Sequence, residues 1–447
     1  MRRDLPKAES LDLFSFDGGV SESCSVLRPD RYWQIEALDH GNPLIPRGGG
    51  YSYAAASFGA GCLVVDMTRF NRILGFDESE RLIDVEAGIT LGELLAFTAP
   101  KGLFLPVVPG YPDITIGGSV AANVHGKCPF SEGTFERIVE SLTLFHPRHG
   151  TFTVDRRENP DLFELTCGGM GLTGMILSAK LRLAELPGFK VTIQRFEVGS
   201  LAAALERLQS MTPESAFAYT WHDGVPRGRT FGRGFVYRGD ITPGASYSET
   251  PRRYRRLDAE TRRRFPVSFL GGLGSRLLTS GFWSVERARP AKATISLFDA
   301  TFPLALRSTY FLLFGRRGLA EFQVIVPFSD AESFLSELEA SLVRHRAPSV
   351  IVSMKLFRGN RRLLRFESDG ICVTVDFART AETRMFLSTL DDICAAAGGV
   401  PNLVKDSRLS AETARASYAG YDEFRERIHA FDPERLFRSE LSQRLGI

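Results

Sequence analysis

The chain has 447 residues, of which 43% are hydrophobic and 24% charged, and its formal net charge is +2 at pH 7. This length predicts two or more hydrophobic cores, and the composition is typical of a globular protein. A net charge near zero gives no indication of a nucleic-acid partner. Because no apolar run suits a signal peptide or a membrane-spanning helix, we expect a cytoplasmic protein, free in solution or associated with the inner face of a membrane.

Neither a disulfide framework nor a metal site is expected. The six cysteines form no Cys-x-x-Cys pair and show no metal-ligand spacing, so we expect reduced thiols. His146 and His149 stand three residues apart, a spacing that could hold a metal ion. Their position in a turn with Pro147 and Gly150 favours solvated turn residues instead.

The first ligand-binding feature in chain order is a glycine turn that follows an apolar strand. Residues 44–53 read Leu-Ile-Pro-Arg-Gly-Gly-Gly-Tyr-Ser-Tyr. Three glycines expose backbone N–H donors, and Arg47 adds a cation, which together suit a pyrophosphate. The motif is weak alone, and it is not the Gly-x-Gly-x-x-Gly fingerprint, because 54–61 leads into a strand rather than a helix.

Strands are predicted over 63–67 and 82–87, the second from the alternation of apolar and acidic residues. A helix is predicted over 91–98, where Thr90 and Glu93 have the spacing of a capping box. A strand over 137–145 and a short helix from Asn159 come later. The order of these elements predicts an α+β arrangement in this part of the chain.

Residues 109–127 combine glycines, hydroxyl residues and small apolar residues, and they end in a His and a Lys. Gly117 and Gly118 lack Cβ atoms, so a large ligand could approach the backbone closely. Thr115, Ser119 and neighbouring N–H groups could bind phosphate oxygens, and small residues up to Val124 would lie flat against a ring system. Taken alone, the stretch fits a β-bulge or tight turn equally well. A third glycine-dense loop follows at 167–176.

Residues 191–399 predict a second domain of strands and helices. The helices are expected over 331–345 and 382–397, and the strands over 311–314, 322–327, 350–356 and 371–377. A basic run covers 252–256 and 262–265 and is continued by Arg276, Arg287, Arg289 and Lys292. It is either a solvated face or a surface for anionic headgroups, where each cation contributes on the order of 1 kcal/mol.

Together, the three glycine loops resemble the FAD-binding half of the vanillyl-alcohol-oxidase-type flavoproteins. The sequences His125-Gly126-Lys127 and Lys405-Asp406-Ser407-Arg408, with the tail from Asp432, resemble the branch of that family that oxidises polyprenylphosphoryl-ribose. This resemblance covers nearly the whole chain. It implies a two-domain α+β flavoprotein: an FAD-binding domain over 1–190, a substrate domain over 191–399 with a mixed or antiparallel sheet and helices on one face, and a segment over 400–447 that returns to the FAD domain.

The resemblance also implies residue roles. Lys405 would be the proton relay or alkoxide stabiliser, with His125 and Lys127 near the flavin and substrate. Substrate contacts would be Gln323, Lys355, Phe357, Trp221, Glu321 and Thr374. FAD contacts would be Arg47, Gly48, Gly49, Gly50, Tyr51, Ser52, Thr115, Gly117, Gly118, Ala121, Ala122, Val124, Gly126, Gly171, Gly174 and Ile176. Without the resemblance, Lys405 and Lys355 would be interpreted as surface lysines, and Trp221 and Phe357 as core residues.

Several positions depart from the family pattern. Tyr51 stands where related sugar-lactone oxidases carry a His bonded to the flavin, so we expect non-covalent FAD. Met170 replaces an Asn near the flavin. Glu321 replaces a Gln, while Cys372 and Thr374 replace an Asn and a Cys, and these three are expected in the sugar pocket.

The expected function is FAD-dependent oxidation of a ring hydroxyl of a polyprenyl-phosphate-linked pentose to a keto group. This would be the first half of an epimerisation, completed by an NAD(P)H-dependent short-chain reductase. One alternative is an aldonolactone or alditol oxidase that acts on soluble sugars. Another is a catalytically degenerate scaffold of a glycolipid pathway, which the substitutions in the sugar pocket would suit.

Overall fold

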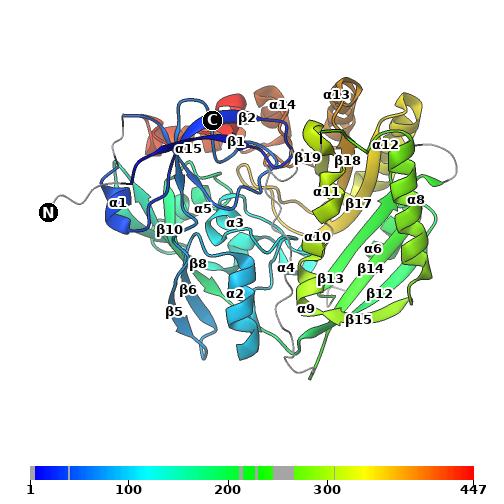
Figure 1. The fold of residues 1–447 in the computed structure, drawn as a ribbon, viewed down its shortest axis with the longest axis horizontal. Helices are drawn as coiled ribbons and strands as arrows, with labels where there is room; N and C mark the ends of the chain where they lie inside the picture. The colour runs from blue at the N-terminus through cyan, green and yellow to red at the C-terminus, as the bar shows by residue number, and fades with distance from the viewer. Residues whose placement is uncertain (1–5, 39–40, 211–214, 227–229, 245–265, 307) are drawn as a thin grey trace.

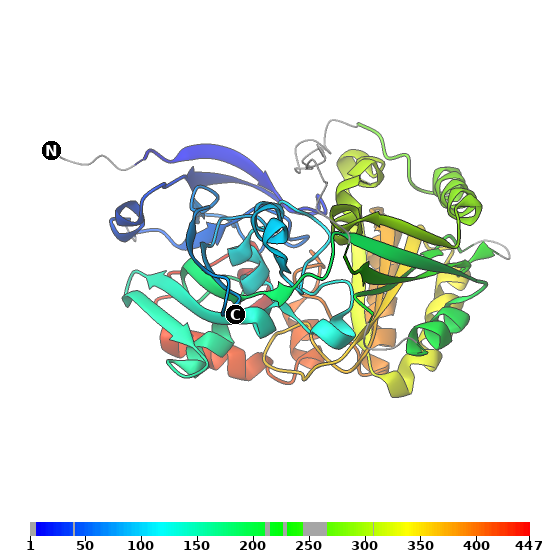
Figure 2. The same ribbon diagram turned by 90° about the horizontal axis from the view of Figure 1, so that it is seen from below.

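The structure is a computed structural model of the 447-residue chain, and it describes residues 6–38, 41–210, 215–226, 230–244, 266–306 and 308–447. Two lobes lie side by side (Figures 1 and 2). The predicted α+β class is confirmed. The basic clusters at 252–256 and 262–265 lie outside the described residues.

The first lobe contains two larger sheets, beside a two-stranded pair of β7 (Leu103–Phe104) and β11 (Ala184–Glu185). A four-stranded mixed sheet has the order β1 (Glu9–Phe14), β2 (Ser21–Leu27), β4 (Leu63–Asp66), β3 (Leu44–Arg47). A five-stranded antiparallel sheet has the order β5 (Ile73–Asp77), β6 (Leu82–Glu86), β10 (Met175–Arg182), β8 (Val139–His146), β9 (Gly150–Asp155). The helices of this lobe include α1 (Tyr32–Glu36), α2 (Leu91–Thr98), α3 (Ile116–Ala121), α4 (Pro129–Glu132) and α5 (Pro160–Thr166).

The capping box predicted for the helix over 91–98 is confirmed. The Thr90 side chain accepts a hydrogen bond from the Glu93 N–H, and the Glu93 carboxylate accepts one from the Thr90 N–H at 2.8 Å. The expectation that His146 is a solvated turn residue is wrong. It ends β8 and is fully buried, because its ring packs between Phe431 and Phe437 from the C-terminal segment.

The second lobe is built on an eight-stranded antiparallel sheet. Its order is β15 (Lys292–Ser296), β12 (Lys190–Val198), β14 (Gly234–Thr242), β13 (Phe217–Asp223), β17 (Ser349–Phe357), β18 (Gly370–Ala378), β16 (Leu319–Val326), β19 (Val400–Pro401). One face packs on α6 (Leu201–Gln209), α12 (Ala331–His345) and α13 (Ala381–Ala396). The predicted helices over 331–345 and 382–397 are thus confirmed to within one residue.

The alternation of side chains along the central strands separates an apolar face from a polar face. On β16, Phe322 and Val324 join the core beneath the helices, whereas Glu321 and Gln323 point the other way. The same period of two places Val375 in that core and Thr374 opposite it on β18. The polar face therefore turns toward the first lobe.

Further helices complete the polar side of the sheet. They are α8 (Leu273–Ala288), α9 (Leu297–Thr301), α10 (Pro303–Leu306) and α11 (Ser308–Leu312). The strand predicted over 311–314 is wrong, because this segment belongs to α11 and the turn that follows. A short apolar run such as Phe-Leu-Leu-Phe fits a buried helix as well as a strand, so its period cannot decide.

The C-terminal segment packs on the first lobe. Its helices are α14 (Ala411–Ser417), α15 (Tyr421–Phe431) and α16 (Glu440–Leu445), coloured orange to red in Figures 1 and 2. The Leu44 N–H donates to the Leu436 carbonyl oxygen at 2.6 Å, and the Glu440 N–H donates to the Phe58 carbonyl oxygen at 2.8 Å. The boundaries at residues 190 and 400 remain predictions. Within the described ranges, no helix is both long and apolar enough to cross a bilayer.

Candidate active site

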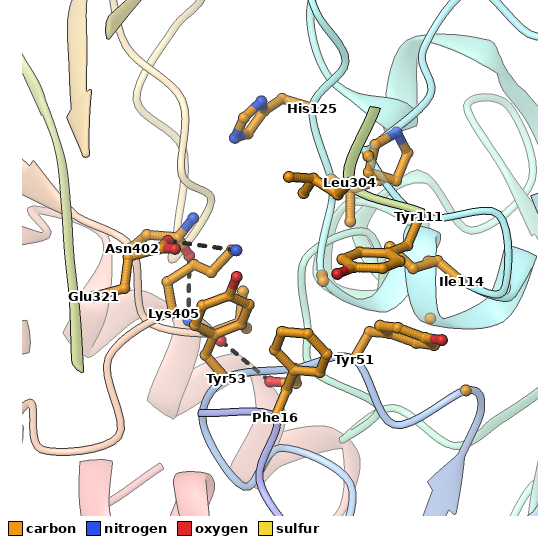
Figure 3. Close-up of a pocket in the computed structure, with 18 of the residues that line it drawn as sticks. Phe16, Tyr51, Tyr53, Tyr111, Ile114, His125, Leu304, Glu321, Asn402 and Lys405 are labelled. Atoms are coloured by element: carbon orange, nitrogen blue, oxygen red, sulfur yellow. Dashed lines mark hydrogen bonds and ion pairs between the residues drawn. The ribbon is translucent and has the colours of Figure 1, made fainter. Parts of the chain in front are cut away.

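A cavity of about 660 Å³ lies between the glycine loops of the first lobe and the polar face of the large sheet. All the residues that the resemblance assigns to FAD line it, as do Lys405, His125 and Lys127. Figure 3 shows Lys405, Glu321 and Asn402 on one side, with Tyr111 and Ile114 opposite them. The cavity thus brings together segments from residue 16 to residue 405.

The turn after β3 leaves backbone donors facing this cavity. Among the residues that the structure describes, the N–H groups of Gly48, Gly49 and Gly50 donate to no protein acceptor. A Cβ on Gly48 would stand 2.1 Å from Thr115 Oγ1, and one on Gly49 would stand 2.5 Å from the Asp113 carbonyl oxygen. Gly50 has a φ of 73°, which favours glycine. A side chain on Gly48 or Gly49 would therefore force neighbouring atoms to shift, and the free donors of the turn suit a phosphate group.

Helix α3 differs from the expectation for this stretch, because its first N–H groups are already used. Those of Ile116 and Gly117 donate to the carbonyl oxygens of Ile89 and Ala87, at 2.9 Å and 2.7 Å. The Ser119 hydroxyl donates to the Thr115 carbonyl oxygen at 2.9 Å. Helix α3 contributes Gly118, Ala121 and Ala122 to the cavity wall rather than phosphate donors.

The third glycine loop packs against α3. The Met170 N–H donates to the Ala121 carbonyl oxygen at 2.9 Å, and Gly171 and Gly174 have φ angles of 82° and 124°. A Cβ on Gly174 would stand 2.6 Å from the Phe145 carbonyl oxygen. These close approaches leave a flat wall with few side chains, which can accept a planar ring system.

Lys405 is anchored by its neighbour in the chain. The carbonyl oxygen of Val404 accepts hydrogen bonds from the N–H groups of Tyr53 and Ala54, at 3.0 Å and 3.1 Å. The Lys405 ammonium lies 3.4 Å from the centroid of the Tyr53 ring and 3.4 Å from Glu321 Oε1. Its side chain is 28% exposed. The C-terminal segment therefore places one amine at a fixed point between the two lobes.

Two further amines line the cavity. Lys355 Nζ donates to the Gly126 carbonyl oxygen at 3.3 Å, and Lys127 Nζ donates to the Val108 carbonyl oxygen at 3.2 Å. Burial and the charge of Lys355 lower the pKa of Lys127 to about 7, and burial also lowers the pKa of Lys355. Burial, followed by the charge of Lys355, lowers the pKa of His125 well below its usual value, so its ring is neutral at pH 7.

The predicted polar contacts form a connected set on the sheet. Asn402 Nδ2 donates to Gln323 Oε1 at 2.6 Å, and Gln323 Nε2 donates to Thr374 Oγ1 at 3.0 Å. Glu321 lies directly opposite Asp376 in the strand register. Trp221 lines the cavity from β13, and its ring lies 4.1 Å from that of Phe282 on α8.

Two predicted residues lie behind the cavity instead of on its wall. Phe357 is fully buried and packs against the His125 ring at 4.9 Å, so it supports that ring. Cys372 lies in the same buried cluster as Phe357, outside the cavity lining. The Cys372 side chain thus lies behind the cavity wall, next to Thr374 and Lys355, and the expectation that its substitution alters the sugar pocket stays a prediction.

Sequence reasoning missed a group of lining residues. Phe16, Tyr53, Tyr111 and Phe311 form an aromatic cluster with Tyr51, with ring centroids 4.9–6.0 Å apart. The other missed residues include Asp376, Tyr310 and Asn402. Tyr53, Tyr111 and Asn402 stand in or near a motif in the sequence, so proximity to the motif is the one signal that could have found them.

The residues present fit FAD: free N–H donors and Arg47 suit a pyrophosphate, and flat glycine-rich walls suit an isoalloxazine. Residues 35–154 match the family described as FAD binding domain. Over 425 residues the chain is 30% identical to decaprenylphosphoryl-β-D-ribose oxidase of Mycolicibacterium smegmatis, covering 92% of this chain and 91% of that protein. The chain belongs to this oxidase family.

Two other relatives show how far the likeness extends. An uncharacterised protein of Streptomyces coelicolor is 30% identical over 371 residues, which cover 80% of this chain and 100% of that protein. L-gulonolactone oxidase of Mus musculus is 27% identical over 175 residues, 39% of each chain. The protein is accordingly an FAD-dependent oxidoreductase of the decaprenylphosphoryl-ribose oxidase family that acts on a CH–OH group of a sugar. Bound FAD supplies the two-electron acceptor for that oxidation.

Proposed function

We propose that this protein oxidises a ring hydroxyl of a polyprenyl-phosphate-linked pentose to a keto group. The observation that carries the proposal is the position of Lys405, whose amine lies in the same cavity as the FAD-binding turns, next to hydrogen-bonding groups that suit a sugar. Lys405 would take or stabilise the hydroxyl proton, while Gln323 and Asn402 would orient the ring. The 30% identity to decaprenylphosphoryl-β-D-ribose oxidase supports this substrate class.

The buried amines of Lys127 and Lys355 support a phosphate-bearing substrate. Both face the cavity beside Gly126. Because the pKa of Lys127 is about 7, its charge is complete at low pH and is lost as the pH rises through 7. A bound phosphate would favour the charged form and hold that proton.

The decisive experiment compares substrates on the purified protein. We expect a yellow preparation whose flavin absorbance is bleached anaerobically by a polyprenylphosphoryl-ribose. Bleaching only by free aldonolactones or alditols would instead identify a soluble-sugar oxidase. A yellow protein that no sugar bleaches would favour the remaining alternative, a catalytically degenerate scaffold. Denaturation should release the yellow colour into the supernatant, because Tyr51 stands where a covalent link would form and its hydroxyl donates to Asp113 at 3.0 Å.

The proposed product needs a second enzyme, since a keto sugar completes an epimerisation only after reduction. We infer an NAD(P)H-dependent short-chain reductase as the partner. Addition of such a reductase with NADH or NADPH should convert the accumulated keto product to the epimeric alcohol.

We also infer contact with the inner face of a membrane through helix α8. Leu278, Thr279 and Phe282 on one side of α8 line the cavity. On its other side, Leu273 and Leu277 are 69% and 67% exposed. Exposed basic residues lie on or just beyond the same helix, namely Arg276, Arg287, Arg289 and Lys292. An apolar surface beside basic residues at the cavity wall suits an acidic bilayer that carries the lipid-linked substrate.

The double variant Leu273→Glu, Leu277→Glu should bind vesicles that contain phosphatidylglycerol about tenfold more weakly than the wild type. Apolar burial is lost, and two charges are added that the acidic lipids repel. Co-sedimentation measures the bound fraction. The control is Met385→Glu on α13, which is 70% exposed on the helical side of the large sheet. Equal binding by the double variant and the wild type would contradict the assignment of α8.

A further inference from the structure

A carboxyl pair lies beside Lys405. Glu321 on β16 and Asp376 on β18 are directly opposite each other in the antiparallel register, and both line the cavity. Tyr310 donates its hydroxyl proton to Asp376 Oδ2 at 2.7 Å. In the part of the chain that the structure describes, Glu321 Oε1 and Asp376 Oδ1 are shielded from solvent and have no hydrogen-bond partner. Two such carboxylates cannot both ionise without a large repulsion, so the pair favours holding one proton.

Glu321 connects this pair to the amine. Its Oε1 lies 3.4 Å from Lys405 Nζ, so Lys405, Glu321 and Asp376 form a continuous series of titratable groups. Lys355, Cys372 and Tyr53 also face this region from β17, β18 and the turn after β3. Burial raises the pKa of the Cys372 thiol to about 12, so it stays protonated. Glu321 is thus the proton acceptor nearest to the Lys405 amine.

Glu321 also reaches a second cavity, of about 800 Å³, on the outer side of the sheet edge. That cavity is bordered by Asp17, Arg379, Ser407 and the first turn of α13. Among the residues described by the structure, Glu321 alone lines both cavities. A proton on its carboxyl group can therefore leave toward solvent without crossing the space that the flavin and sugar would fill.

We propose that Glu321, with Asp376, carries the substrate hydroxyl proton from Lys405 to solvent through the second cavity. This inference rests on the proposed oxidation. The substrate O–H bond breaks and its proton binds Lys405 Nζ, while a Lys405 N–H proton passes to the Glu321 carboxylate and then to water. FAD, when bound, would accept the hydride of the same carbon, so both electrons and the proton are accounted for. Lys405 touches the substrate; Glu321 is a positioning and relay residue.

The titration of Asp376 supports the relay. Burial, followed by the charge of Glu321, raises the pKa of Asp376 to about 7. Below that pH Asp376 holds a proton, and above it Asp376 is ionised, so the pair accepts a proton more readily. The rate of flavin bleaching should therefore rise as the pH increases through 7.

The test uses the FAD-loaded enzyme and four forms of it: wild type, Glu321→Gln, Asp376→Asn and the control Glu332→Gln, an exposed carboxylate in the first turn of α12. The first readout needs no substrate. Infrared difference spectra recorded below and above pH 7 should show one buried carboxyl C=O band that titrates in the wild type and the control, that titrates at lower pH in Glu321→Gln, and that disappears in Asp376→Asn.

The second readout is the anaerobic bleaching rate as a function of pH. Glu321→Gln should bleach at least about tenfold more slowly and lose the rise through pH 7, with FAD content unchanged. A wild-type rate and pH profile in Glu321→Gln, or a C=O band that persists in both carboxyl variants, would overturn the relay. If no sugar bleaches the wild type, the proposed oxidation and the relay are both overturned. Failure of the relay alone is thus distinguishable from failure of the proposed oxidation.

Discussion

Lys405→Met is expected to leave the protein yellow and to slow its bleaching by lipid-linked ribose by about a hundredfold to ten-thousandfold, the usual contribution of a general acid or base. The amine is the group that lies above Tyr53 and beside Glu321, whereas the backbone hydrogen bonds of the segment belong to Val404. A Met side chain keeps the length and most of the packing, so the fold and the FAD turns should be unaffected. Anaerobic stopped-flow absorbance of the flavin measures the rate.

Lys101→Met is the matched control for Lys405→Met. Lys101 also places its ammonium on an aromatic ring, 4.6 Å from the centroid of Phe97, but it is exposed and lies outside the cavity lining. If the loss of any lysine–aromatic contact were enough to reduce the rate of flavin bleaching, both variants would bleach more slowly than the wild type. Bleaching by Lys405→Met at a rate close to that of the wild type would remove the assigned role of this residue.

Gly49→Ala is expected to abolish FAD binding and to give a colourless protein, with a flavin-to-protein ratio at least about tenfold lower. The new Cβ would stand 2.5 Å from the Asp113 carbonyl oxygen, a backbone atom that cannot move alone. The turn must therefore shift, and the N–H donors of residues 48–50 would lose their alignment toward the ligand. Absorbance of the purified protein measures the ratio.

Gly199→Ala is the control for the added methyl group, because a Cβ there meets no atom within 4 Å and the backbone has no positive φ. Circular dichroism separates loss of cofactor from loss of fold. A yellow Gly49→Ala protein with wild-type flavin content would show that the turn at residues 48–50 does not hold the cofactor.

The glycine loops and Lys405 could be predicted because each depends on a local motif. A glycine that allows close approach has no substitute, and the Lys-Asp-Ser-Arg segment is recognisable without its neighbours. The sequence cannot show how Asp376, Tyr310 and Phe16 meet, since they come from three distant segments and only the register of the large sheet and the packing of α11 bring them to one cavity.

Other errors have the same physical origin. The N–H groups at the start of α3 were expected to face a phosphate, but the Ile89 and Ala87 carbonyl oxygens accept two of them. Phe357 lies on the same sheet face as Lys355 and was expected to contact the substrate, but the His125 ring covers the Phe357 side chain. A motif predicts which groups are available, whereas long-range packing decides which of them remain free.

The attachment of the C-terminal segment has a consequence for biosynthesis. The carbonyl oxygen of Val404 accepts hydrogen bonds from the N–H groups of Tyr53 and Ala54, so the Lys405 amine reaches its place only when this late segment of the chain folds onto the first lobe. An N-terminal portion still on the ribosome has its glycine turns but lacks the strand edge and the amine that complete the cavity. Cofactor capture in its final geometry must therefore follow synthesis of the segment that carries Lys405.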